Sequence, residues 1–133
     1  MNVAVFFVCG NSRTNAYVMD TAMFVPAAFL VKIITGGFAR AITLYPFVFV
    51  RRRSDMHDSV LVNHEKIHLR QQAELLLLPF YVLYLLEYVR GRLKRLSHYE
   101  AYRQISFERE AFDMEKDQEY LKIRKWCAFR KYL

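Results

Sequence analysis

The chain has 133 residues, of which 54% are hydrophobic, and a formal net charge of +7. Its length suits a single domain, and its apolar content excludes intrinsic disorder over most of the chain. Its two cysteines, Cys9 and Cys127, are too few for a disulfide framework, a cysteine-rich zinc finger or an iron–sulfur site. The positive charge points to anionic partners.

The N-terminal part of the chain is apolar but weakly patterned. We therefore separate residues 1–40 from residues 41–133, within a single domain overall. Met1–Cys9 lacks the leading Lys or Arg of a secretory signal. An N-terminal membrane anchor and a later start at Met19 or Met23 both stay open. The expected location is the cytoplasm, with peripheral or N-terminally anchored membrane association as the alternative.

The first clear element lies in Ala41–Arg51, which is rich in β-branched and aromatic residues and predicts a strand. Pro46 places this strand at a sheet edge or gives it a bulge. A polar loop follows, and Asp58–Ser59 can cap a helix over residues 60–78. An edge strand or hairpin thus precedes the first helix.

Two further helices are predicted. The second covers residues 79–90, and Gly91 helps to end it. A capping box of Ser97 and Glu100 starts the third, which runs to about Lys122. The fold class is therefore mainly α with a small β element, an α+β arrangement.

Residues 64–68 read His-Glu-Lys-Ile-His, a HExxH motif on the first predicted helix. Residues four apart share a helix face, so His64 and His68 can bind one metal ion. Neutral imidazoles suit zinc, and a catalytic zinc takes three protein ligands and keeps one position open. Glu65 lies about 100° around the helix and can act as general base toward water. The alternative is two histidines at helical spacing without a metal.

The third ligand would come from a later helix, where Glu108 and Glu110 are the candidates. At about 100° per residue, Glu108 lies in the middle of a mostly apolar face. Glu110 lies about 200° away, on a polar face expected to meet solvent. A buried carboxylate needs a partner. Glu108 is therefore either a zinc ligand or part of a buried ion pair with an arginine, and the upstream motif favours the ligand.

Together, His64–His68 and Glu108–Ala111 resemble the motifs of the gluzincin metallopeptidases. Over about Ile42–Lys122 the chain is more closely similar to a group of short, uncharacterised bacterial HExxH proteins. This resemblance implies a zincin-like fold, one Zn²⁺ per chain, a peptide or protein substrate, a catalytic Glu65, and zinc ligation by His64, His68 and Glu108. It also implies that the strand near Leu44–Phe49 pairs with an extended peptide.

One position departs from the pattern of these relatives. Where many of them carry an Asp four residues after the ligand Glu, this chain has Phe112. That Asp would orient a histidine from behind. Glu115 is the candidate replacement, because it lies about 20° from Glu108 around the helix. The departure supports an alternative function, a catalytically inactive zinc-binding domain.

Three more residues are candidates for lining the cleft or stabilising an oxyanion: His98, Tyr102 and Gln71. For Gln71, a solvated position on the first helix is the competing interpretation. Basic clusters beside apolar stretches, and a basic aromatic tail over residues 122–133, support a third function. In that case the chain is a basic protein peripheral to an anionic membrane, and its HExxH motif is incidental. Nucleic acid is a less favoured partner, and no oligomeric state is predicted.

Overall fold

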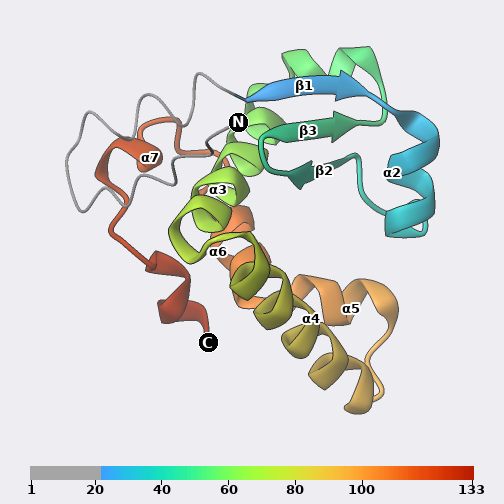
Figure 1. Cartoon of the computed structure of the whole chain (residues 1–133), viewed down its shortest axis with the longest axis vertical. Coiled ribbons are helices and arrows are strands. Elements are labelled where there is room, and N and C mark those ends of the chain that lie inside the picture. The colour runs from blue at the N-terminus through green and yellow to red at the C-terminus, as the bar shows by residue number, and fades with distance from the viewer. Residues whose placement is uncertain (1–21) are drawn as a thin grey trace, which may run out of the picture.

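A small three-stranded sheet opens the fold in residues 22–133, the part of the chain that this computed structural model describes (Figure 1). Strand β1 (Met23–Pro26) runs parallel to β3 (Phe47–Val50). Strand β2 (Ala41–Leu44) runs antiparallel to β3. The order β1-β3-β2 leaves β2 at an edge of the sheet.

The single strand predicted over Ala41–Arg51 is wrong, because this stretch forms the β2–β3 hairpin. Tyr45 and Pro46 make the turn between the two strands. Pro46 has no N–H to contribute to a ladder, so a turn suits it better than a strand interior. The hairpin, which was the alternative for the element before the first helix, is confirmed.

Residues 22–40 belong to the same unit as the rest of the described chain. They supply β1 and helix α2 (Ala28–Thr35), which buries Val31. Helix α2 ends at Gly36, whose φ of 65° lies in the left-handed region that glycine adopts without strain. The signal, anchor and start-site predictions for Met1–Cys9 and Met19 lie outside the described residues.

Helix α3 (Ser59–Leu75) follows a short 3₁₀ turn, Arg53–His57, and meets helix α4 (Leu77–Leu93) at a bend of 114°. The bend falls at Leu76, whose φ of 63° a right-handed helix cannot continue through. A break between two helices was predicted at Pro79 and does occur, but it lies at Leu76, and Pro79 is tolerated in the first turn of α4. Within residues 22–133 no helix is by itself long and apolar enough to cross a membrane, although the bent pair together meets that measure.

The predicted end of the second helix at Gly91 is also wrong. Gly91 lies inside α4, where a Cβ atom would come within 3.0 Å of the Cβ atom of Ala101. The glycine therefore permits close packing between α4 and helix α5 (His98–Arg103).

The long third helix predicted to reach Lys122 is instead three short helices. They are α5, α6 (Ser106–Met114) and α7 (Tyr120–Ile123), and a 3₁₀ turn at Ala128–Tyr132 follows. The predicted capping box of Ser97 and Glu100 does start α5. Asn63 of α3 helps to end α6, since its side-chain amide donates to the carbonyl groups of Met114 and Glu115.

Helix α3 lies between the sheet and α6 (Figure 1). Its Leu69 packs with Val48 and Val50 of β3. Its Ile67 packs with Ala111 of α6. The described chain is thus mainly helical with a small sheet, and α3 brings the HExxH residues to the centre of it.

Candidate metal centre

Helix α3 presents a run of buried polar side chains. Its start is fixed by Asp58, whose carboxylate accepts hydrogen bonds from the N–H groups of Val60 and Leu61 at 3.1 and 3.2 Å. Its buried polar residues are Asn63, His64, Glu65, His68, Gln71, Gln72 and Glu74. Buried polar groups are costly unless they are partnered, so their concentration here indicates a functional site.

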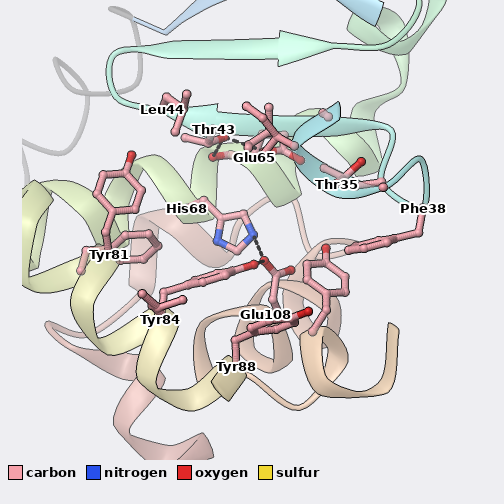
Figure 2. Close-up of a pocket in the computed structure, with 18 of the residues that line it drawn as sticks. Thr35, Phe38, Thr43, Leu44, Glu65, His68, Tyr81, Tyr84, Tyr88 and Glu108 are labelled. Atoms are coloured by element: carbon pink, nitrogen blue, oxygen red, sulfur yellow. Dashed lines mark hydrogen bonds and ion pairs between the residues drawn. The ribbon is translucent and has the colours of Figure 1, made fainter. Parts of the chain in front are cut away.

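Three side chains that could ligate a metal ion converge between α3 and α6. The Nε2 atoms of His64 and His68 lie 3.1 Å apart. The carboxylate oxygens of Glu108 lie 3.4 Å from Nε2 of His64 and 3.3 Å from Nε2 of His68. All three side chains are buried, and one ligand atom from each lies within 4.8 Å of the others, so the group could hold a metal ion. Figure 2 shows His68 and Glu108 facing each other at this point.

The hydrogen bonds of the two Nδ1 atoms determine whether the Nε2 atoms of His64 and His68 are free to bind a metal. Nδ1 of His64 lies 2.9 Å from the carboxylate of Glu115, and Nδ1 of His68 lies 2.8 Å from Oε1 of Gln71. Both partners are hydrogen-bond acceptors, so we assign the proton of each neutral ring to Nδ1. Each Nε2 atom then directs a lone pair toward Glu108, as metal ligation requires.

This donor set fits a cation. Two imidazole lone pairs and a carboxylate converge, and Oε2 of Glu108 is buried without a hydrogen-bond partner among the described residues. In the metal-free protein a proton on His68 supplies part of the positive charge that this site favours. Burial lowers the pKa of His68, but the negative charge of Glu108 and its hydrogen bond outweigh burial and raise that pKa to about 9. A bound metal ion would displace this proton.

The pKa of Glu108 moves in the opposite direction. Burial alone would raise it, but the two histidines hold the pKa of this carboxyl well below its ordinary value. Glu108 is therefore an anion in the folded protein, which is the form that ligates a metal.

Glu65 lies beside the ligand group. Its Oε2 atom accepts a hydrogen bond of 2.6 Å from the hydroxyl of Thr43 on β2, so strand and helix together fix the carboxylate. Glu65 and Thr43 both line a cavity of about 800 Å³ that also reaches His68 and Glu108 (Figure 2). A carboxylate in this place can exchange a proton with a molecule held in the cavity.

The cavity is walled by α2, β2, α3, α4, α5 and the first turn of α6, and most of its lining is apolar or aromatic. The predicted cleft residues His98 and Tyr102 both line it. His98 hydrogen-bonds the hydroxyl of Tyr88 through Nδ1. Burial and the nearby charge of Glu108 raise the pKa of Tyr102, so its hydroxyl stays protonated and can donate.

The structure corrects the expectations for Gln71. It is fully buried behind His68, and so it is neither solvated nor part of the cavity wall. Its Nε2 atom donates to the carbonyl of Phe107 and to the carboxylate of Glu110, both at 3.1 Å. Those acceptors orient the amide so that its oxygen faces His68.

The structure also shows that Glu110 does not meet solvent. It is fully buried, and it accepts hydrogen bonds from Tyr120 and Arg124. Helical phase separates Glu110 from Glu108, but the C-terminal segment folds back over the face that carries Glu110. Short-range spacing around Glu110 gives no sign of this cover, which Tyr120 and Arg124 supply from further along the chain.

Two residues of the site were not anticipated. The hydroxyl of Tyr84 donates to Oε1 of Glu108 at 2.7 Å, although the sequence marks Tyr84 only as part of an apolar helix. The side chain of Gln72 donates to the carbonyl of Thr43 and accepts from the N–H of Tyr45, both at 2.9 Å. No local pattern announces either contact, because each joins segments far apart in the chain.

Comparisons with protein-family models, with curated proteins and with solved structures found no match to this chain.

Proposed function

We propose that this protein is a zinc-dependent peptidase with a zincin-like arrangement of edge strand, HExxH helix and later glutamate. The observation that carries the proposal is the buried group of His64, His68 and Glu108, with the carboxylate of Glu65 beside it at a cavity. Three protein ligands would leave a coordination position open, as in catalytic zinc sites, whereas structural zinc sites are closed by four.

Zinc is the metal that the donor set favours, because imidazole nitrogens and a carboxylate oxygen are among its usual ligands. When bound, zinc supplies Lewis acidity, which polarises a carbonyl oxygen and makes water acidic near neutral pH. The chain holds His64 and His68 in the ligating orientation through Glu115 and Gln71.

Glu65 would move the proton in this reaction. Its Oε2 atom is held by Thr43, so Oε1 is the atom available to accept a proton from water and to return it to the leaving amine. His98 and Tyr102 are our candidates for stabilising negative charge on the substrate oxygen, since both line the cavity.

Strand β2 would pair with an extended substrate peptide. Alternation in the β2–β3 ladder directs the backbone N–H and C=O groups of Ala41 and Thr43 away from β3. Gln72 already takes the carbonyl of Thr43 and the N–H of Tyr45. A peptide is therefore expected to pair at the Ala41 end of β2, over a short length.

The alternative of an inactive zinc-binding domain is motivated by Phe112. Its ring packs against His64 with centroids 4.6 Å apart, at the sequence position where the gluzincin-like pattern would carry an Asp. Glu115 gives His64 an acceptor from the following turn instead. This contact supports the catalytic proposal, because the histidine is oriented without that aspartate.

The test compares zinc content and hydrolysis of a fluorescence-quenched peptide library in wild type and in variants of Glu65, Glu108 and Glu119. We expect wild type and Glu65→Gln to hold about one zinc per chain, while hydrolysis by the variant falls by about 10²- to 10⁴-fold. Glu119→Gln is the matched control, because Glu119 is exposed at the start of α7 and lines no part of the cavity, and it should behave as wild type.

Each other result has a definite meaning. Hydrolysis by Glu65→Gln at the wild-type rate would contradict the proposal that the protein is a peptidase using Glu65. A wild-type protein that binds zinc but cleaves no member of the library would instead be the inactive zinc-binding domain. Loss of zinc in Glu108→Ala is expected in both cases, and retention of tight zinc binding there would exclude the three-ligand site.

A further inference from the structure

Helix α4 carries an apolar stripe that the described chain does not cover. Its members are Leu78, Val82, Leu86, Val89 and Leu93, which are between 42% and 79% exposed. At about 100° per residue, these five positions fall within about 80° of one another. Because α4 has 17 residues, the stripe runs along a helix about 25 Å long. Monomeric soluble proteins rarely expose so continuous a row of aliphatic side chains.

Helix α2 carries a second exposed apolar face beside the same cavity. Its Phe29 and Ile33 are 78% and 62% exposed. Ile33 also lines the cavity, and so does the exposed Leu85 on α4. The two helices therefore present apolar side chains on either side of the same opening. Both lie on the side of the molecule away from α7 (Figure 1).

The charges around this surface are positive. Arg90, Arg92, Lys94 and Arg95 are all exposed in the last turn of α4 and just beyond it. The acidic residue of α4, Glu87, is turned to the N–H and hydroxyl of Ser106. The charged residue of α2 is Lys32. An apolar helix face bordered by cations is the composition of helices that lie in the surface of anionic bilayers.

We propose that this surface docks on an anionic lipid bilayer. We call it the docking face, and it consists of Phe29, Ile33, Leu78, Val82, Leu86, Val89 and Leu93. Helix α4 would lie in the plane of the interface, since 17 residues fall short of the roughly 20 that span a bilayer. The mouth of the cavity then opens at the lipid surface. Docking does not depend on peptide hydrolysis, but an active site placed in this way would meet polypeptide segments that lie at the membrane.

The experiment is flotation of the full chain with phosphatidylcholine vesicles, with and without phosphatidylglycerol. We expect wild type to float with the anionic vesicles and less so as salt is added. Leu86→Gln combined with Leu93→Gln should lower the partition coefficient about tenfold or more, because both side chains leave the lipid. Arg92→Gln combined with Lys94→Gln should lower it about fivefold for each charge removed. Both pairs lie outside the ligand group and the cavity lining, so zinc content should not change.

The matched control is Ile123→Gln combined with Lys122→Gln on α7, an exposed apolar and basic pair on the other side of the molecule (Figure 1). It should float as wild type does. The proposal is overturned if wild type ignores anionic vesicles at low salt, or if the control loses binding as much as the docking-face variants. It is also overturned if the Leu86 and Leu93 substitutions leave flotation unchanged but separate a wild-type dimer, since a second copy then covers the face. None of these outcomes depends on whether peptides are cleaved.

Discussion

At the scale of single residues, Gln71 holds His68 in the orientation a metal needs. Replacement by Leu removes the acceptor of Nδ1 and frees the ring to turn or change tautomer. We expect Gln71→Leu to weaken zinc binding by about 10- to 100-fold, measured by competition with a chromogenic chelator. Gln104→Leu, at an exposed position at the end of α5, is the control and should bind zinc as wild type does. Unchanged zinc affinity in a folded Gln71→Leu protein would remove this role.

Some residues of the site can be predicted from short-range sequence patterns, and others cannot. The spacing of His64 and His68 and the helical phase of Glu108 are short-range properties, and the structure brings these three side chains together. Tyr84 of α4 donates to Glu108 of α6. No spacing rule predicts this contact, because it depends on the 114° bend between α3 and α4. Glu110 shows the same limit, because burial of a helix face depends on whether a distant segment folds over it.

At the scale of elements, the N-terminus of α3 depends on Asp58. The N–H of Leu61 and the side chain of Arg40 hold the pKa of Asp58 below its ordinary value of 3.8. A lowered pKa in the folded state means that the stabilisation is complete above about pH 4 and is lost as pH falls through the folded value. We expect Asp58→Ala to reduce the free energy of unfolding by about 1 kcal/mol at neutral pH.

Urea denaturation of metal-free protein over a range of pH values checks this expectation. The difference between wild type and Asp58→Ala should narrow as the pH falls through the lowered pKa of Asp58, because the charged part of the cap is lost there. Asp58→Asn keeps an acceptor for the cap but cannot titrate, so it should stay close to wild type in stability near neutral pH and show a smaller dependence on acid. A difference that is constant with pH would show that the charge of Asp58 contributes nothing.

The elements themselves were predictable in type but less so in length. The hydrophobic patterns identify the helices that became α3 and α4, and the capping box identifies the start of α5. The pattern placed the first break at Pro79 in place of Leu76 and missed the second, at Gln104. Neither Leu76 nor Gln104 is a residue type that ordinarily ends a helix. The pattern also assigned an end to Gly91, which serves the contact between α4 and α5 instead.

At the scale of the whole molecule, Arg124 ties the C-terminal segment to the two ligand helices. It is buried and donates to Glu74 of α3 and Glu110 of α6. Its removal would leave the buried carboxylate of Glu110 without a cation and Glu74 with Arg70 alone. We therefore expect Arg124→Leu to reduce the free energy of unfolding by about 3 kcal/mol or more. Thermal or urea denaturation measures the change, and Arg130→Leu, at an exposed position nearby, should fall within about 0.5 kcal/mol of wild type. Equal stability of the two variants would contradict the linking role of Arg124.

The contact between Gln72 and the outer edge of β2 has a consequence for how copies of this chain behave in a crowded solution. An unpaired strand edge beside apolar surface is a template on which further strands can add, the first step of aggregation. The side-chain amide of Gln72 hydrogen-bonds both the C=O of Thr43 and the N–H of Tyr45, as a neighbouring strand would. Gln72 thus shortens the part of the β2 edge with which another strand can pair. A short peptide can still bind there, but continued addition of strands, as in an aggregate, is disfavoured.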